Sequence, residues 1–495
     1  MAFRDKHLII GAGPVGLAMA KAMKQHGLPY DHVDAGPGLG GNWRHGLYEN
    51  VHIVSSKRST AFADFPMPAH YPDFPSAAQL LAYLESYARV HGLDAAIEPG
   101  RTVSAVRPLV DDTWNVVLDD DEHRHYKGVI VCNGHHRDPR MPTYPGQESA
   151  PLIHANDYRA PSELQDKRIL VIGGGNSACD IASEAARVGA SSDMSLRSGY
   201  WFLPKTFLGR PLTDLPIWNL PVFVQRLVLR GVIQLVIGDY RAYGLQRPRQ
   251  KLFERHPTFG TEVLGYMAQG RIKPRPDIEC FDGRTVRFRD GSTGEYDLVV
   301  AATGYHNSFP FLPAGMIDVK NDAVQVYGSA FPPDVKNLYI VGSNQPRNGF
   351  GNIVTPAVAL FARLIRMQDE IEHPIGAVLQ WQGDPLPETN LMDPGAANRE
   401  IWLSNRMLWV LRLQSRRPAV SPANAGGSVR PLNSSKMTRR LQNCQMRFPR
   451  NAKQRRHERS RAISMGQWRA PAANSSAPDR SRSIAARSLL SAASK

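Results

Sequence analysis

The sequence predicts an α/β fold built from two Rossmann-like, dinucleotide-binding domains, the second inserted in the first. Two glycine-rich loops carry this prediction: residues 11–16 read GAGPVG and residues 173–178 read GGGNSA. Each loop follows a short apolar run typical of a buried strand and precedes a segment with helical spacing. Such a loop directs backbone N–H groups at the pyrophosphate of a dinucleotide. Two loops therefore indicate a protein that holds two dinucleotides.

The residue that follows the first loop is acidic. Asp34 ends the strand-like run 30–33 and lies 21 residues after Gly13. Its carboxylate can accept hydrogen bonds from ribose hydroxyls, which indicates FAD or NAD. The alternative is a solvated acid in a surface loop. The residues expected to contact this cofactor are Gly11, Gly13, Pro14, Gly16 and Asp34.

The residue that follows the second loop is basic. Arg197 ends the strand-like run 194–196 and lies 22 residues after Gly175. A guanidinium cannot accept a hydrogen bond from ribose, but it pairs bidentately with phosphate, which indicates the 2′-phosphate of NADPH. The alternative is an unpaired surface arginine. The residues expected to contact NADPH are Gly173, Gly175, Asn176, Ser177 and Arg197, with Ala178 as a tolerated replacement of the third glycine.

Hydrophobic patterns divide the chain into four parts. We expect an FAD domain over 1–165, an inserted NADP domain over 166–304, a return to the FAD domain over 305–415 and a basic tail over 416–495. The patterns within them predict a helix over 76–92, a strand meander over 101–132, a strand over 337–342 and a helix over 354–369. Thr303 and Gly304 stand where the two domains rejoin, and we expect them to form a hinge beside the cofactors.

The positive charge of the chain is concentrated in the tail. The whole sequence carries a net charge of +15, whereas residues 416–495 hold 18 Lys+Arg against 2 Asp+Glu, which leaves 1–415 nearly neutral. The tail is rich in Arg, Ser, Ala and Pro and has no periodic apolar pattern, so we expect it to be disordered. It could bind anionic lipid or nucleic acid, be an inert solvated segment, or be out-of-frame translation of a GC-rich gene. We favour the last two and expect no specific nucleic-acid partner.

The cysteines indicate a reducing, cytoplasmic setting. The four of them are scattered and form no CxxC pair, which argues against a disulfide framework, a zinc site and a redox dithiol. No signal peptide precedes the first strand-like run. The apolar segment 216–238 carries Arg226 and Arg230, which argues against a membrane span. We expect it to form a helical pair over the substrate site; the alternative is a weak membrane-surface contact.

Several further motifs make the chain resemble the flavin-containing monooxygenases, of the class B flavoprotein type, over roughly residues 5–412. They follow one another in that family's order, and only their combination is specific. They are GGNW at 40–43, FADFP at 62–66, CNGHH at 132–136, HANDY at 154–158, DIA at 180–182, RSG at 197–199 and ATGY at 302–305.

The resemblance implies a function. In this family NADPH reduces FAD, reduced flavin and O2 form a C4a-hydroperoxide, and one oxygen atom passes to a small organic substrate. The flavin supplies the chemistry and the protein supplies orientation and a dry pocket, so no acid–base dyad is required. The resemblance places Gly41, Trp43 and Asp64 beside the flavin half of FAD, and His154 and Tyr158 in the linker between the domains. Lys57 and Arg58 are basic candidates for contact with flavin or NADPH, or else solvated surface residues.

The chain departs from the family's pattern at informative places. Glu148 and Ala150 replace the Phe and Gly of the family's identifying motif. Tyr158-Arg159 replaces the Trp-Pro of the ketone-oxidising relatives, and Val54 stands where amine- and sulfide-oxidising members carry Asn. A short stretch over 238–248 is similar to the plant YUCCA branch. An NADPH oxidase that releases hydrogen peroxide is the alternative function, and a homodimer is an open expectation.

Overall fold

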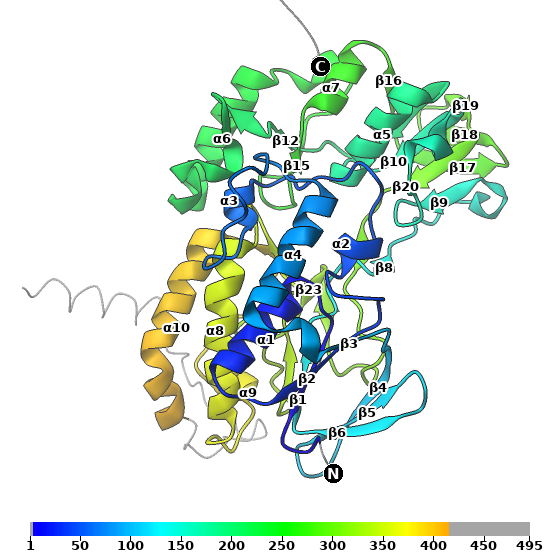
Figure 1. Ribbon diagram of the computed structural model, residues 1–495. Helices are drawn as coiled ribbons and strands as arrows, with labels where there is room; N and C mark the ends of the chain where they lie inside the picture. Colours follow the sequence, from blue (N-terminus) through cyan, green and yellow to red (C-terminus); the bar gives the residue numbers. More distant parts are fainter. Residues whose placement is uncertain (1–2, 415–495) are drawn as a thin grey trace, which may run out of the picture. The chain divides into compact units, whose positions relative to one another are not determined.

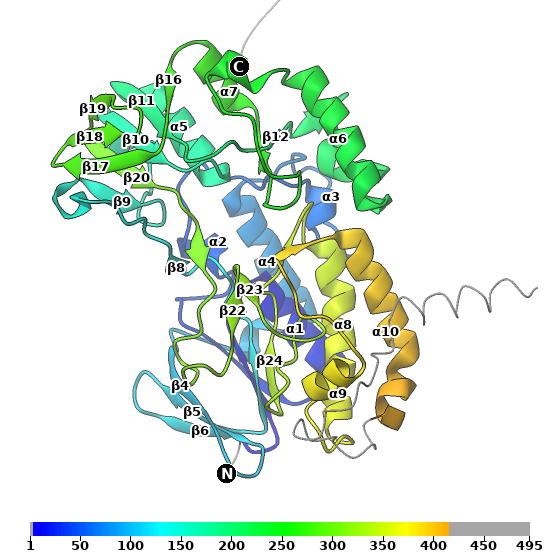
Figure 2. The same ribbon diagram turned by 180° about the vertical axis from the view of Figure 1, so that it is seen from behind.

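The computed structural model describes residues 3–414 and contains two five-stranded parallel sheets (Figures 1 and 2). The first sheet has the order β24-β7-β1-β2-β3, and the second has the order β16-β11-β10-β20-β9. In each sheet the strand before a glycine-rich loop lies at the centre: β1 (His7–Ile10) in the first and β10 (Arg168–Ile172) in the second. The tail assigned to 416–495 lies outside the described residues.

The first sheet separates two hydrophobic cores. Its strands are β1, β2 (Tyr30–Asp34), β3 (Ile97–Pro99), β7 (Gly128–Val131) and β24 (Leu338–Ile340). Ile9 and Ile130 point to one face, which is covered by α1 (Pro14–Gln25), α4 (Ala77–His91) and α8 (Gly351–Gln368). Leu8 and Val129 point to the other face, which is covered by the meander β4 (Val103–Pro108), β5 (Trp114–Leu118) and β6 (His123–Tyr126). This alternation follows from the two-residue period of a strand.

The second sheet repeats this design. Its strands are β9 (Leu152–His154), β10, β11 (Ser191–Ser195), β16 (Ile272–Arg275) and β20 (Leu298–Ala301). Helices α5 (Asn176–Val188) and α7 (Glu262–Ala268) pack on one face, and the meander β17 (Ile278–Asp282), β18 (Thr285–Phe288) and β19 (Thr293–Glu295) packs on the other. Strand β9 belongs to this sheet although the sequence assigned residues up to 165 to the first domain.

Two short strands connect the domains. β8 (Asp138–Pro139) leaves the first domain, β21 (Tyr305–His306) returns to it, and the two pair antiparallel. Thr303 and Gly304 precede β21. The Thr303 hydroxyl donates to the carbonyl of Arg140 at 2.5 Å, and the Arg140 amide donates to the carbonyl of Gly304 at 2.9 Å. The two crossings are therefore joined at the position where the sequence predicts a hinge.

The segment 216–238 differs from the predicted helical pair. It forms a short 3-10 turn, η5 (Pro216–Asn219), and one α-helix, α6 (Val222–Val236). Pro221 separates them because it has no N–H to continue a helix and instead precedes the first turn of α6. Within residues 3–414, no helix has both the length and the apolar character needed to cross a bilayer.

The remaining elements are short or lie at the end of the described chain. The helices are α2 (Asn42–His45), α3 (Lys57–Thr60), η1 (Asp94–Ala96), η2 (Gln147–Ser149), η3 (Pro161–Leu164), η4 (Leu212–Asp214), η6 (Tyr240–Tyr243), α9 (Ile375–Trp381) and α10 (Pro394–Gln414). The strands are β12 (Phe202–Leu203), β13 (Thr206–Phe207), β14 (Arg210–Pro211), β15 (Thr258–Phe259), β22 (Val319–Lys320), β23 (Ala323–Val324), β25 (Gln345–Pro346) and β26 (Leu391–Met392).

Candidate cofactor sites

The first glycine loop is closely packed against its own domain. Gly11 has φ +101°, and a Cβ there would lie 2.5 Å from the carbonyl oxygen of Cys132. A Cβ on Gly16 would lie 1.8 Å from the carbonyl oxygen of Gly11. Pro14 occupies the first turn of α1, where its fixed φ suits the helix and its missing N–H costs nothing. These three residues set the tight turn from β1 into α1.

The predicted acid of the first domain orders this loop. One Asp34 oxygen accepts from the Ala12 amide at 2.5 Å, and the other accepts from the Gly36 amide at 2.7 Å. An ionised carboxylate has about four acceptor sites, so two remain for ribose hydroxyls. The Nε2 atom of His32, two residues earlier on β2, forms a hydrogen bond with the carbonyl oxygen of Gly11 at 3.0 Å. Burial lowers the pKa of His32, so its neutral ring donates this hydrogen bond.

The segment 40–43 packs backbone to backbone against the first loop, and the Gly40 amide donates to the carbonyl of Ala12 at 2.9 Å. Gly41 has φ +56°, and a Cβ on it would lie 3.0 Å from the Cα of Gly13. Trp43 lies two residues after Gly41. Its side chain is half-buried and packs against the cores of both domains. Asp64 is exposed and forms an ion pair with the buried Lys21 on α1. Asp34 keeps acceptor sites for ribose, and the loop leads into the N-terminus of α1, so the residues present fit FAD at this loop.

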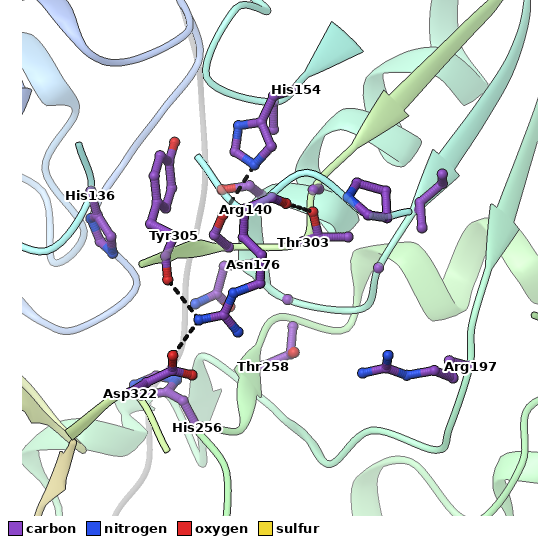
Figure 3. Close-up of a pocket in the computed structure, with 18 of the residues that line it drawn as sticks. His136, Arg140, His154, Asn176, Arg197, His256, Thr258, Thr303, Tyr305 and Asp322 are labelled. Atoms are coloured by element: carbon purple, nitrogen blue, oxygen red, sulfur yellow. Dashed lines mark hydrogen bonds and ion pairs between the residues drawn. The ribbon is translucent and has the colours of Figure 1, made fainter. Parts of the chain in front are cut away.

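A cavity of about 570 Å³ lies at the second loop and reaches residues of both domains (Figure 3). Its lining includes Gly173, Gly175, Asn176, Ser177, Arg197, Thr303 and Gly304, which are all of the contacts predicted for this loop and the hinge. Gly173 has φ +125° and faces the carbonyl of Ala302, whereas a Cβ on Gly175 would meet no atom within 4 Å. The open side of Gly175 is where a ligand can approach the backbone.

Arg197 is set up to receive an anion. It is exposed just after β11 and lines the cavity. Figure 3 shows it at some distance from the cluster around Arg140. Within residues 3–414 its guanidinium makes no hydrogen bond or ion pair. The ring of Tyr200 packs beside it against Gly174, whose missing Cβ would lie 2.5 Å from the ring. An unpaired guanidinium next to a glycine-rich helix N-terminus fits a cofactor with an extra phosphate.

The structure adds residues that the sequence did not single out. Thr258 on β15 donates to the carbonyl of Gly174 at 2.6 Å, and the neighbouring Phe259 amide donates to Asn176 Oδ1 at 2.9 Å. The side chain of Asn176 therefore holds β15 as well as lining the cavity. His256 lines the cavity on the same segment. No short-range motif marks these contacts, because they join residues more than 80 positions apart.

A polar cluster lies where the cavity meets the domain linker. Arg140 donates to the carbonyl of Tyr305 at 3.1 Å and forms an ion pair with Asp322 (Figure 3). Burial lowers the pKa of His136 to about 3 and that of His256 to about 4. Both imidazoles are therefore neutral near pH 7, so Arg140 and Arg197 supply the cationic charge of this cavity.

The linker residues of the identifying motif have structural partners. His154 contacts the carbonyl of Gly304 at 3.1 Å through Nε2 and accepts from the Asn156 amide at 3.0 Å through Nδ1. Tyr158 is fully buried, and its hydroxyl donates to Glu184 on α5 at 2.5 Å. Glu184 also accepts from Asn50 of the first domain at 2.8 Å. These contacts tie α5 to the linker and to the first domain.

The two basic candidates near the expected flavin ring already have partners. The Lys57 ammonium donates to the carbonyl of Ala69 at 2.9 Å and to that of Tyr71. Arg58 forms ion pairs with Asp214 at 2.7 Å and with Asp73 at 3.3 Å. Neither side chain lines the cavity at the second loop. Arg58 thereby holds α3 against η4, and Lys57 holds it against the segment 69–71.

Comparison with known proteins identifies the family. The family described as Flavin-binding monooxygenase-like matches residues 4–366. Flavin-containing monooxygenase 5 of Rattus norvegicus is 30% identical over 369 residues, which are 68% of this chain and 69% of the relative. Indole-3-pyruvate monooxygenase YUCCA1 of Oryza sativa subsp. japonica is 30% identical over 316 residues, 61% of this chain and 77% of the relative.

Solved structures share the fold. S-allyl-L-cysteine S-oxygenase from Allium sativum superposes with a TM-score of 0.56 at 21% identity, over 81% of this chain and 88% of the other. Cyclohexanone monooxygenase from Rhodococcus sp. Phi1 bound to NADP+ gives a TM-score of 0.63 at 16% identity, over 82% of this chain and 98% of the other. At such identities the likeness concerns the fold alone.

The fold and the two loops define a two-domain flavoprotein oxidoreductase. The chain belongs to the flavin-containing monooxygenase family. It is an FAD- and NADPH-dependent monooxygenase that transfers an oxygen atom from O2 to a small organic substrate.

Proposed function

We propose that FAD lies along the first loop, with its ribose at Asp34 and its pyrophosphate at the N-terminus of α1, and that NADPH occupies the cavity at the second loop. The observation that carries the proposal is Arg197, which lies on the cavity wall just after β11 and whose guanidinium has no partner among residues 3–414. The 2′-phosphate of NADPH would pair with it. Gly175 and the N-terminus of α5 would receive the pyrophosphate.

The domain boundaries follow from this placement. FAD belongs to the parts 1–165 and 305–415, and NADPH belongs to 166–304, with β9 contributing to the NADPH domain. Bound FAD supplies the redox chemistry by accepting a hydride and activating O2. The protein orients the two cofactors through the clamp of Thr303 and Gly304 on Arg140, where a change of angle would bring the nicotinamide toward the flavin and withdraw it.

The test of this placement is the choice between NADPH and NADH. A charged hydrogen-bond pair contributes about 1.5–3 kcal/mol, so Arg197→Ala is expected to weaken NADP+ binding roughly 10- to 150-fold. NADH kinetics should stay within about twofold, because NADH has no 2′-phosphate for the guanidinium to bind. Binding is measured by titrating FAD-loaded protein with NADP+, and kcat/KM is measured for both nucleotides. Arg89→Ala, an exposed arginine on α4, is the control. An unchanged ratio of NADPH to NADH efficiency would show that another residue binds the phosphate.

Oxygen transfer is separated from the oxidase alternative by stoichiometry. NADPH consumption and hydrogen peroxide release are measured together with each candidate substrate. Peroxide release below NADPH consumption, with an oxygenated product, supports transfer. Equal amounts with every substrate would refute it. A cytoplasmic location and a homodimer stay predictions from the sequence.

A further inference from the structure

Helix α6 exposes a large apolar surface. We define the α6 outer face as Phe223, Leu227, Val228 and Leu235 of the helix, together with Leu220 just before it. The side chains of Phe223, Leu227 and Leu235 are 73%, 72% and 76% exposed. These positions recur at helical spacing, so they share one side of the helix. The opposite side, which includes Gln225, Leu229, Val232 and Ile233, is buried against the second domain.

The outer face is not needed to hold the helix in place. The buried side already packs into the core, and Gln225 donates to the carbonyl of Leu220 at 2.7 Å. A surface helix normally carries polar residues on its outward side, whereas a helix that is apolar on both sides has an apolar partner. No acidic residue occurs anywhere in α6. The outer face therefore indicates a binding surface.

Exposed basic residues lie on α6 and in the segment that follows it, and we call them the basic flank. Arg230 lies on α6 itself, and Arg241, Arg247, Arg249 and Lys251 follow in the next segment, all exposed. Arg226 on α6 donates to the carbonyl of Leu252 at 2.8 Å, which keeps that segment against the helix. Residues 220–251 carry six Lys+Arg and a single acid, Asp239, for a net charge of +5. Asp239 is paired with Arg241 and Arg247.

We propose that the α6 outer face binds the surface of an anionic phospholipid bilayer, with Phe223, Leu227 and Leu235 inserted at the headgroup boundary and the basic flank on the lipid phosphates. Apolar side chains and cations beside each other on one helix are the features of an interfacial helix. The helix lies in the plane of the membrane and does not cross it.

Charge argues against two other occupants. A two-fold contact between copies places the same patch opposite itself, so two flanks of net +5 would face one another. The segment 416–495 carries 18 Lys+Arg and 2 Asp+Glu, and its net positive charge would likewise be repelled by the flank. An anionic bilayer is the partner that complements both the apolar face and its basic border.

The test measures cosedimentation of the full FAD-loaded chain with vesicles of phosphatidylcholine alone or mixed with phosphatidylglycerol. We expect binding to the mixed vesicles only. Phe223→Ser/Leu227→Ser is expected to reduce the partition coefficient at least about tenfold, because each inserted side chain contributes about 1.5–3 kcal/mol when fully buried. Val110→Ser, at the exposed turn between β4 and β5, is the matched control and should leave binding unchanged.

Three results would overturn the proposal. Mixed vesicles that bind the double variant as well as the unaltered chain would show that insertion of the α6 outer face is not responsible. Absence of binding to mixed vesicles would exclude the bilayer. A dimer in sedimentation velocity that Phe223→Ser/Leu227→Ser dissociates would assign the face to a second copy. Leu235→Ser provides an independent variant, and flavin content with the thermal midpoint confirms that each variant folds.

Discussion

A single methyl group on the second glycine loop should separate NADPH binding from folding. Gly175 has φ −77° and ψ −179°, an extended conformation that any residue adopts, and its Cβ would meet no protein atom within 4 Å. Gly175→Ala should therefore fold with about the same stability, because the more restricted unfolded chain offsets the loss of a glycine at the N-cap of α5. The same methyl group would occupy the space through which the pyrophosphate approaches the backbone. A steric cost of about 1–3 kcal/mol corresponds to NADP+ binding roughly 5- to 150-fold weaker.

Gly173 provides the matched comparison two residues away. Its φ of +125° is a conformation that other residues rarely adopt, and its Cβ would lie 2.4 Å from the carbonyl oxygen of Ala302. Backbone strain costs of order 1–3 kcal/mol and the overlap adds about 1–3 kcal/mol. Gly173→Ala should therefore lower the thermal midpoint, whereas Gly175→Ala should not.

Two measurements on FAD-loaded protein decide between these outcomes. The thermal midpoint reports stability, and titration with NADP+ reports the dissociation constant. A stable Gly175→Ala variant that binds NADP+ within twofold of the unaltered protein would refute the placement of the pyrophosphate. Equal destabilisation by the two substitutions would refute the steric argument itself.

Three further predictions concern the first domain and its surroundings. Gly13→Ala, whose Cβ would meet only the Cα of Gly41 at 3.9 Å, should fold but purify with less flavin, as the ratio of absorbance at flavin and protein wavelengths shows. His7 is 1% exposed and has a pKa of about 4, below its ordinary 6.5, so the unfolded chain takes up this proton first as pH falls. His7 alone should therefore lower the free energy of unfolding by about 3 kcal/mol as pH falls from 6.5 to 4, and His7→Leu should remove that contribution from the pH profile of urea denaturation. Arg347 and Asp393 form an ion pair of 2.7 Å, and their side chains are 10% and 14% exposed. Asp393→Asn should therefore lower the free energy of unfolding, measured in urea, by roughly 3–5 kcal/mol, because it leaves the Arg347 charge buried without a counter-ion.

Local patterns predicted the parts of the fold that depend on neighbouring residues. The helix predicted over 76–92 is α4, which begins after Ser76 because that side chain and Gln79 form a capping box. It ends at Gly92, whose left-handed conformation suits glycine. The turn at Gly11 likewise depends on residues within one strand and one helix.

Long-range pairing was not predictable in the same way. Strand β9 is only three residues long, and nothing in its own pattern shows that it pairs with β20 nearly 150 residues later. The contacts of Thr258 with the second loop and of Glu184 with Asn50 also join distant segments. The sequence shows that Lys57 and Arg58 are basic, but it does not show which groups they contact, because those partners lie in other segments of the chain.

The adjacent crossings β8 and β21 make the second domain an insertion whose two chain ends lie side by side. The chain enters at Asp138–Pro139 and leaves at Tyr305–His306, and these strands are hydrogen-bonded neighbours. Insertions whose two ends meet are the ones a host domain accommodates without rearrangement. Exchange of the segment between β8 and β21 with that of a relative would therefore transfer nucleotide preference as a unit, while the flavin domain keeps its own core.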